Sequence, residues 1–557
     1  MSDSLMRWPA LLWLKKETTP CQSWHPLLFA VVATSAMTLM FNEAFFRALQ
    51  QHIPGQFALQ LSLLALVFLL NLLLVLILGQ GRALKPVVLL LFLTGAAAAY
   101  FQHSFGVVLD KGMLQNALET DSAEASGLLS LDLIWHLAQW MAFPVLLSVV
   151  ARIQVQTWRQ QMLHSVAATA VVLLSIVALG ATQFSELAPF FRNYRDVKHL
   201  ALPVSPIVAA SSLMAKQLKA AVPASFTVLG QDAVRTPLAA GQKPRLLVLV
   251  LGETARADHF ALNGYPRNTT PLLNQLPVYS FATVSSCGTA TAHSVPCMFS
   301  VQNRDNYDEA VAKNSSNVLD ILAATGVDAS WLDNNSGCKG VCDRLPSELL
   351  FERPDPRCTD GQCLDSVLLD AFRQALSQRL QAAHTDRIIV LHQLGSHGPE
   401  YFRRSADADK HFLPECTDKQ IQLCAPEHIV NAYDNSIVAT DQLLASVIAE
   451  LGQHTDYDSA MLYLSDHGES LGENGVYLHG LPYWMAPEAQ THIPMIWWMS
   501  ADEADAARLD KGCLKQQQQQ PLSQDYLFHT LLGFFNLSTS LYQPKLDFLE
   551  PCRRGEV

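Results

Sequence analysis

Charged residues are scarce in this chain, and their scarcity limits the kind of protein that it encodes. Only 16% of the 557 residues are Asp, Glu, Lys or Arg, whereas 50% are hydrophobic. The length exceeds one ordinary domain, and the composition excludes an ordinary soluble protein. No small-residue cleavage site follows the first apolar run, and several more runs come after it, which argues against a secretory signal peptide.

Long apolar runs are absent beyond about residue 245, so any membrane part lies in the N-terminal portion. Each of the earlier runs is long enough to cross about 30 Å of hydrocarbon. The second contains no charged residue, which favours a span over a buried core helix. We predict an N-terminal domain of five transmembrane helices over residues 1–182, with spans at 26–46, 57–79, 84–102, 130–151 and 162–182.

The short loops indicate the orientation of these spans. Lys and Arg are enriched in cytoplasmic loops, and here they occur before span one, between spans two and three, and between spans four and five: Arg7, Lys15, Lys16, Arg82, Lys85, Arg152 and Arg159. We therefore expect a cytoplasmic N-terminus. Five spans then place everything after about residue 183 on the opposite side, which is the periplasm in a Gram-negative bacterium.

The sequence lacks the two CxxC pairs of a zinc ribbon. It has eleven cysteines, and all but Cys21 lie in the region expected outside, mostly as close pairs. An oxidising compartment explains such pairs as disulfides. The expected bridges are Cys287–Cys297, Cys338–Cys342, Cys358–Cys363, Cys416–Cys424 and Cys513–Cys552, with Cys21 left as a reduced cytoplasmic thiol.

Two further segments follow the spans. Residues 183–243 mix apolar and basic positions with prolines, which fits an interfacial connector along the membrane surface and fits a plain linker equally well. From 244 to 557, short apolar runs alternate with amphipathic stretches, a pattern typical of an α/β domain with a mainly parallel sheet. The clearest strands end at Leu251, near Leu394, at Ser465 and at Ser500.

Acidic and histidine side chains follow three of these strands. Glu253 follows the first, His397 the second, and Asp466 with His467 the third, with His479 thirteen residues beyond Asp466. Ligands bind at the carboxyl ends of strands in open α/β sheets. Carboxylate oxygens and imidazole nitrogens suit zinc. Each residue alone would be an ordinary loop residue, but their joint occurrence predicts a metal site.

A loop of small and hydroxyl residues, SSCGTATAHSVPCMFS, lies between the first two strands. A bridge between Cys287 and Cys297 would hold this loop in place before a helix and present a hydroxyl with fixed geometry. The candidate nucleophiles are Thr289, Thr291 and Ser294, although any one of them could simply cap the helix.

Together, the motifs GETARAD, SCGTATA, SVPCMFS, NNSGCKG, GSHGP, AYDNS and SDHGESLGENGVYLHG closely resemble the phosphoethanolamine–lipid A transferases, including the mobile colistin-resistance enzymes, of the alkaline phosphatase and sulfatase superfamily. The resemblance implies Thr291 as nucleophile and Glu253, Thr291, Asp466 and His467 as ligands of at least one Zn²⁺. It assigns His397 and His479 to the phosphate or to a second zinc, and Asn335, Ser336 and Lys339 to substrate contacts. His293 and His392 are interpreted as structural or merely nearby.

The resemblance also reaches the loop between spans three and four. Asn116, Thr120 and Glu124 share one face of a helix there, and the matching positions of the family help to bind the ethanolamine head group. Without the resemblance, this face would be interpreted as solvated. The implied partners are phosphatidylethanolamine as donor, lipid A as acceptor and the membrane lipids. We expect no nucleic-acid partner, a monomer, and a multi-pass protein of the bacterial inner membrane with a periplasmic catalytic domain.

The sequence also bears on other functions that such a fold could have. A sulfatase needs Arg four residues after the residue that becomes modified. Ser294 would be that residue here, and Met298 stands in place of the Arg. A non-catalytic membrane sensor would be expected to have lost ligands, and every expected ligand is present. A transporter is disfavoured because no span carries a charge pair near its middle. Another lipopolysaccharide or protein acceptor stays open, because relatives that differ in acceptor share these motifs.

Overall fold

The computed structural model describes residues 23–119, 130–194, 197–220, 225–236, 241–377, 385–507 and 509–554. Within it the chain forms two compact units. The first comprises residues 1–97, 135–197 and 201–204, and the second comprises residues 98–134, 198–200 and 205–557. Cys21, Thr120 and Glu124 lie outside the described residues.

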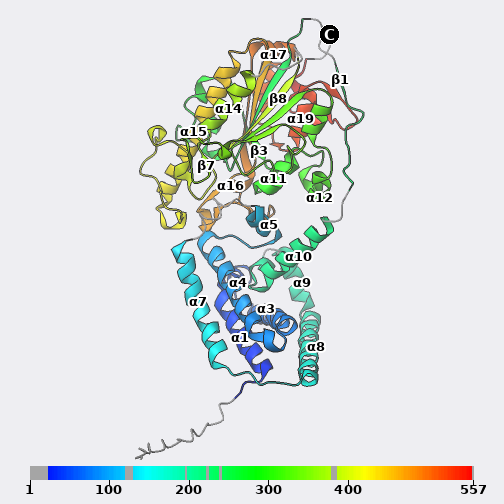
Figure 1. Cartoon of the computed structure of the whole chain (residues 1–557), viewed down its shortest axis with the longest axis vertical. Coiled ribbons are helices and arrows are strands. Elements are labelled where there is room, and N and C mark those ends of the chain that lie inside the picture. The colour runs from blue at the N-terminus through cyan, green and yellow to red at the C-terminus, as the bar shows by residue number, and fades with distance from the viewer. Residues whose placement is uncertain are drawn as a thin grey trace, which may run out of the picture. The chain divides into compact units, whose positions relative to one another are not determined.

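Apolar helices dominate the N-terminal part of the chain (Figure 1). Among the described residues, four stretches are long and apolar enough to cross a membrane, and a bent helix pair adds a fifth candidate. This confirms the expected N-terminal group of transmembrane helices. The helices are α1 (Pro26–Phe41), α2 (Glu43–His52), α3 (Phe57–Leu78), α4 (Leu84–Phe105), α5 (Lys111–Glu119), α7 (Leu131–Val150), α8 (Trp158–Thr182), α9 (Phe184–Asn193) and α10 (Val204–Ala220).

The first predicted span, 26–46, is not one continuous helix. It breaks at Asn42, where α1 and α2 meet at a bend of 62°. The buried side chain of Asn42 donates a hydrogen bond to the carbonyl of Leu202 (2.9 Å) and accepts one from the Leu202 amide (2.8 Å). Asn71 of α3 donates to the same carbonyl (3.0 Å). These long-range hydrogen bonds fix the break, and the sequence alone gave no sign of them.

An eight-stranded sheet organises the second unit, in the order β13-β3-β12-β9-β2-β8-β4-β5. It is mainly parallel, as expected, because only β12 runs antiparallel to its neighbours β3 and β9. The strands are β2 (Arg245–Gly252), β3 (Tyr279–Ser285), β4 (Asp328–Asp333), β5 (Ser347–Leu349), β8 (Arg387–His392), β9 (Asp458–Ser465), β12 (His492–Met499) and β13 (Leu522–Ser523).

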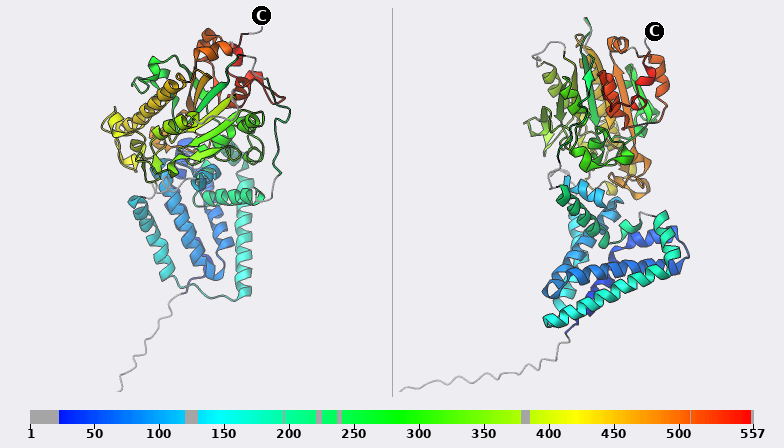
Figure 2. Two further views of the ribbon diagram at one scale, coloured as in Figure 1. Left: turned by 45° about the horizontal axis from the view of Figure 1, so that its top comes forward. Right: turned by 90° about the vertical axis from the view of Figure 1, so that its right-hand side faces the viewer.

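Helices cover both faces of this sheet, as the views in Figures 1 and 2 show. Alternate residues of β2 point into two separate hydrophobic cores, Leu247 and Leu249 into one and Leu246 and Val248 into the other. Because both faces are buried, the strand is a continuous apolar run rather than an alternating one. The covering helices are α11 (Thr291–Met298), α13 (Val318–Ala324) and α19 (Tyr526–Phe534) on the first core, and α14 (Ser366–Ser377) and α15 (Pro426–Leu451) on the second.

Short helices and two-stranded ribbons complete the second unit. They are α12 (Glu309–Lys313), α16 (Glu488–Thr491), α17 (Ala501–Ala506), α18 (Lys511–Gln517), β1 (Val234–Arg235), β6 (Cys358–Thr359), β7 (Gln362–Cys363), β10 (Ser470–Leu471), β11 (Tyr477–Leu478) and β14 (Leu537–Ser538). Five disulfides stabilise this unit, in the pairs expected from the sequence: Cys287–Cys297, Cys338–Cys342, Cys358–Cys363, Cys416–Cys424 and Cys513–Cys552. A protein of this kind needs an oxidising compartment.

Replacing Asn42 with Ala should destabilise the membrane unit. The change leaves the amide of Leu202 without the acceptor that it has now, and an unsatisfied buried donor costs about 1 to 3 kcal/mol. The melting temperature of the full chain in detergent should fall. Ser62→Ala is the matched control, because Ser62 bonds only to Ala58 of its own helix. Equal melting temperatures for the two variants would contradict this role of Asn42.

Candidate metal centre and active site

The parallel pairing of β2 and β9 brings two acidic residues together. Gly252 and Ser465 are opposite each other at the carboxyl ends of these strands. The next residues in each chain segment, Glu253 and Asp466, therefore lie side by side. Asn335 follows β4 and His397 follows β8 at the same edge of the sheet. Three of the four strand ends expected from the sequence thus converge, whereas Ser500 ends the antiparallel strand β12 beside the start of β9, at the opposite edge.

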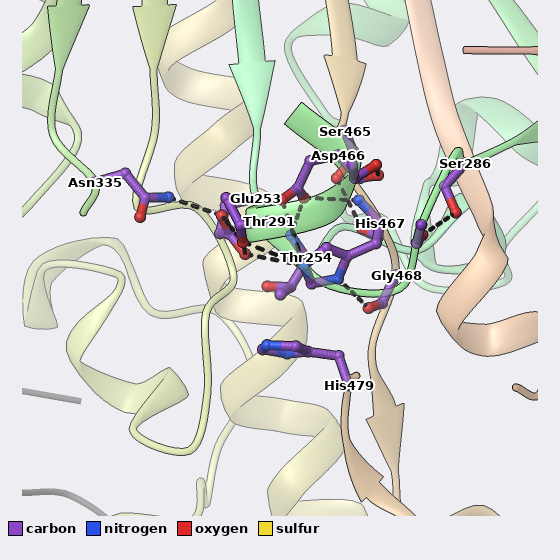
Figure 3. A network of polar contacts seen from close by, with 12 residues as sticks. Glu253, Thr254, Ser286, Thr291, Asn335, Ser465, Asp466, His467, Gly468 and His479 are labelled. Atoms are coloured by element: carbon purple, nitrogen blue, oxygen red, sulfur yellow. Dashed lines mark hydrogen bonds and ion pairs between the residues drawn. The ribbon is translucent and has the colours of Figure 1, made fainter. Parts of the chain in front are cut away.

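Glu253, Asp466 and His467 form a compact and fully buried group. Each is 0% exposed, and one possible ligand atom from each lies within 4.8 Å of the others. Nε2 of His467 is 3.4 Å from Glu253 Oε1 and 3.3 Å from Asp466 Oδ2. Figure 3 shows the three side chains pointing toward one another. Two carboxylates and an imidazole in this arrangement could bind a metal ion.

The protonation pattern of His467 favours a ligand role. Its Nδ1 lies 2.9 Å from the carbonyl oxygen of Gly468, and a carbonyl only accepts hydrogen bonds. Nδ1 therefore carries the proton, and Nε2 turns its lone pair toward the carboxylates. Burial is the main cause of the lowered pKa of His467. The charge of Asp466 raises this pKa, and the nearby His479 lowers it further. The neutral, metal-binding form of the ring is thereby favoured.

The two carboxylates are incomplete without a cation. Oδ1 of Asp466 accepts hydrogen bonds from the amides of Thr254 (3.1 Å) and His467 (2.7 Å). Its buried Oδ2 accepts none from any residue that the structure describes. Burial and the charge of Asp466 raise the pKa of Glu253 well above its usual range. A bound cation would remove the cost of burying two like charges side by side.

Thr291 is the candidate nucleophile that the structure brings to this group. It is the first residue of α11 and is 7% exposed. Its Oγ1 lies 3.0 Å from both carboxylate oxygens of Glu253 and 3.3 Å from Nε2 of His467. The other two candidates are engaged elsewhere. Thr289 donates to the carbonyl of Leu481, and Ser294 donates to the carbonyl of Asp466 and to Gln524.

Two further histidines, His479 and His397, lie beside His467 of the metal-binding group. The ring of His479 lies 4.5 Å from that of His467 and 5.3 Å from that of His397, measured between centroids. Nδ1 of His479 lies 3.2 Å from Oε2 of the buried Glu469. Burial, and next the charge of His479, lowers the pKa of His397 well below its usual range. His397 and His479 are thus adjacent, and His479 also contacts the ring of His467.

The NNSG loop after β4 connects to Glu253 through Asn335. The side-chain amide of Asn335 donates to Glu253 Oε2 (2.8 Å) and to the carbonyl of Gln393 (2.8 Å). Ser336 donates to Oδ1 of Asn335, and Lys339 donates to Oγ of Ser336. The hydrogen bonds of Ser336 and Lys339 thus reach the centre only through Asn335.

The two histidines interpreted as structural lie outside the metal-binding group. Nδ1 of His392 is 2.8 Å from the carboxylate of Asp333. That carboxylate also accepts hydrogen bonds from the backbone amides of Asn335 and Gly337. His392 therefore supports the NNSG loop. The ring of His293 packs against Tyr307 at 4.9 Å.

Helix α5 lies against the loop that follows His479. A Cβ built on Gly480 would come within 3.1 Å of Met113 Sδ and 3.7 Å of Asn116 Nδ2. Gln115 donates a hydrogen bond to Glu309 of α12 (2.7 Å). A cavity of about 170 Å³ lies between α5 and the Cys287 loop, lined by Gln115, Asn116, Thr289, His293 and Tyr483 among others. Of the three head-group residues expected from the sequence, the structure thus describes Asn116, next to the CGTAT motif.

Sequence analysis missed Glu469 and Gln524. Glu469 is inside the SDHGES motif, and its spacing of two from His467 was the available signal. Gln524 had no signal, because it follows the two-residue strand β13 outside every motif. Its amide donates to the carbonyls of Ser465 and Asp466 (2.7 Å each), and its Oε1 accepts from Cys287 N (2.6 Å) and Ser294 Oγ (2.8 Å). Gln524 thereby links the metal-binding loop to the nucleophile loop.

Comparisons with known proteins agree with this geometry. The family model described as Sulfatase matches residues 245–537, and the model described as Phosphoethanolamine transferase EptA/EptB matches residues 66–218. Phosphoethanolamine transferase EptA of Escherichia coli K12 is 39% identical over 95% of this chain and 97% of its own. Phosphatidylethanolamine transferase Mcr-1 of E. coli is 36% identical over 97% and 99%. The solved lipooligosaccharide phosphoethanolamine transferase A of Neisseria meningitidis superposes with a TM-score of 0.89 at 35% identity, covering 95% of this chain and 99% of that one.

Replacing Gln524 with Glu should weaken metal binding. The new carboxylate oxygen would face the carbonyls of Ser465 and Asp466, to which the amide now donates. Changes to residues that orient metal ligands typically cost about 10- to 100-fold in metal affinity. Calorimetric titration of the full chain in detergent with a divalent transition metal measures the effect. Gln516→Glu, at an exposed position, is the matched control, and equal affinities in both variants would refute the linking role of Gln524.

Proposed function

Because the chain belongs to the EptA/EptB family of phosphoethanolamine transferases, we propose that it moves phosphoethanolamine from phosphatidylethanolamine to a phosphate of lipid A. The chain is thus a transferase. The observation that carries the proposal is the position of Thr291, whose hydroxyl lies within 3.3 Å of both Glu253 and His467. A hydroxyl at the start of a helix, among metal-binding side chains, is suited to attack a phosphodiester.

Zinc is the metal that these residues fit best. Asp and Glu oxygens with a His nitrogen are typical zinc ligands. The buried Oδ2 of Asp466 has no hydrogen-bond partner among the described residues, so it could bind the ion. Glu253, Thr291, Asp466 and His467 would hold the ion. When bound, zinc supplies positive charge that lowers the pKa of the Thr291 hydroxyl and draws a substrate phosphate toward it. Next to this site, the side chains of His397, Glu469 and His479 would offer ligands for a second zinc ion.

The reaction proceeds in two displacements at one phosphorus atom. Thr291, having lost its proton, bonds to the phosphorus of phosphatidylethanolamine, and diacylglycerol leaves. The head group then remains on Thr291 as a phosphoethanolamine ester. A phosphate of lipid A attacks this ester and releases Thr291. His397, His479 and Lys339 contribute N–H donors to the phosphoryl oxygens, where charge must be stabilised in phosphoryl transfer.

The ammonium that each transfer adds would make lipid A less anionic. A less anionic outer membrane attracts cationic peptides less strongly. We therefore expect the chain to confer resistance to polymyxins such as colistin. The head group itself would be recognised beside α5, with Asn116, Thr120 and Glu124 as its contacts. The cavity between α5 and the CGTAT loop supports this placement for Asn116.

The apolar helices and the disulfides suggest a role for each part of the chain. We propose that residues 1–182 anchor the enzyme in the inner membrane of a Gram-negative bacterium with the N-terminus in the cytoplasm. Residues 183–243 then serve as the interfacial connector, and residues 244–557 form the catalytic domain in the periplasm, where disulfides form. The enzyme would act as a monomer on lipids of its own membrane.

Thr291→Ala should abolish the transfer, because the variant lacks the oxygen that takes up the head group. Thr291→Ser should keep part of the activity, since the hydroxyl remains. Mass spectrometry of lipid A from Gram-negative cells expressing each variant measures the added phosphoethanolamine directly. Modified lipid A in cells with Thr291→Ala would refute the assignment of Thr291 as the nucleophile. If the wild-type chain modified core sugars or proteins but not lipid A, lipid A would be the wrong acceptor.

Glu124→Ala should slow turnover of phosphatidylethanolamine but spare a small diester without an amine. Losing a hydrogen bond to a charged group costs about 1.5 to 3 kcal/mol, or about 10- to 100-fold in rate. A head-group-labelled fluorescent lipid and bis(p-nitrophenyl) phosphate, both given to the full chain in detergent, provide the contrast. Glu186→Ala, an exposed carboxylate of α9, is the control. Undiminished lipid turnover in Glu124→Ala would mean that this residue does not contact the head group.

A further inference from the structure

The membrane unit contains a cavity that the transfer reaction does not use. Its volume is about 410 Å³, within the range of typical small-ligand sites. It lies where α1, α4 and α8 begin and α3 ends, next to the segment between α7 and α8. All of its described lining residues belong to the unit of residues 1–97, 135–197 and 201–204, whereas Thr291 belongs to the other unit. The cavity therefore needs a separate explanation.

Positive charge is concentrated around this cavity. Arg82 and Lys85 line it beside the imidazole rings of His25 and His164, and the described lining includes no carboxylate. Three helices also direct their N-terminal ends toward it, because Pro26, Leu84 and Gln161 belong to the first turns of α1, α4 and α8. The partial positive charge of helix N-termini adds to that of the side chains. The net charge of the whole chain is −12, so this concentration of cationic groups runs against the composition.

The walls of the cavity are held by contacts between distant segments. Trp24 donates its amide to the Arg152 carbonyl (2.7 Å) and accepts from the Gln154 amide (2.9 Å). Gln156 lies 3.0 Å from Nε2 of His25 and 3.3 Å from Nδ1 of His164. Two more lining residues bond to other segments: Lys85 donates to the Ser148 carbonyl (2.6 Å) and Ser165 to Gln80 (2.7 Å). The cavity is thus a built feature rather than a gap between loosely packed helices.

Part of the remaining lining is apolar, beside the polar Gln80, Gln154, Gln156, Gln161 and Ser165. Leu27, Ala30, Leu76 and Leu84 contribute to it, and these residues belong to helices of the membrane unit. A ligand that fills such a cavity combines an anionic group with hydrocarbon. A small soluble anion would leave the apolar part unused. A zwitterionic lipid would bring an ammonium that meets no carboxylate in the described lining.

We propose that this cavity binds the phosphate head group of an anionic phospholipid from the leaflet at this end of the helices. Basic pockets between transmembrane helices bind such head groups in other membrane proteins. The phosphate would sit among Arg82, Lys85 and His164, and the start of an acyl chain would lie along the apolar lining. The bound lipid is a structural partner of the anchor and is distinct from the phosphatidylethanolamine consumed at Thr291.

Native mass spectrometry of the full chain in detergent tests the proposal. The wild-type chain, titrated with phosphatidylglycerol and in parallel with phosphatidylethanolamine, should retain one phosphatidylglycerol more tightly. Arg82→Gln should weaken that binding by about fivefold, the usual contribution of one cation near a lipid surface. The double variant Arg82→Gln/His164→Gln should weaken it further. Arg159→Gln removes an exposed charge of α8 outside the cavity lining and should bind as the wild type does.

Three outcomes would overturn the proposal. Equal losses in Arg82→Gln and Arg159→Gln would mean that only overall charge attracts the lipid. Equal retention of phosphatidylethanolamine and phosphatidylglycerol would mean that the cavity does not select an anionic head group. Displacement of the retained lipid by millimolar inorganic phosphate would identify a site for soluble anions. Arg82 is exposed, so its replacement leaves the fold intact, and an unchanged melting temperature verifies this.

Discussion

The site depends on one constraint, the burial of two carboxylates side by side at the end of a parallel strand pair. Glu253 and Asp466 are both 0% exposed, and they are adjacent because β2 and β9 pair in register up to Gly252 and Ser465. Burying an uncompensated charge costs several kcal/mol. The raised pKa of Glu253 reflects that cost in the absence of a cation. A metal ion bound to both carboxylates would resolve this conflict, so the burial of the pair supports the metal site proposed above.

Residues from distant parts of the chain hold this arrangement in place before any substrate binds. Gln524 links the backbone after β9 to the loop that carries Thr291, Asn335 fixes one oxygen of Glu253, and Gly468 orients His467. The bridge between Cys287 and Cys297 closes the nucleophile loop. Because the residues that contact Thr291 are themselves held by further hydrogen bonds, Thr291 would not need to move to attack a phosphodiester, as proposed above, and such preorganisation is the main source of electrostatic catalysis.

The sequence predicted the parts of this site that follow local rules. Polar residues after apolar strands identified Glu253, His397 and Asp466, because carboxyl ends of parallel strands meet at one edge. Close cysteine pairs identified the disulfides. The missed features depend on contacts between residues far apart in the chain. Gln524 acts on Ser294, 230 positions away, and Asn42 breaks the first span by bonding to Leu202, 160 positions away. No local pattern records such a contact.

That break bears on how many times the chain crosses the membrane. Trp24, before α1, pairs with Ile153, before α8, so the two helices begin at the same end of the bundle. Asn42, after α1, bonds to Leu202, which the chain reaches only after α8 and α9. Helix α1 therefore begins beside α8 and ends against the segment that follows α9. Among the described residues, α3, α4, α7 and α8 are long and apolar enough to cross a membrane, and the bent pair of α1 and α2 adds a fifth candidate. The five crossings proposed above would put the loops that carry Arg82 and Arg152 on the side opposite to the disulfides, as the charges and the cysteines each favour.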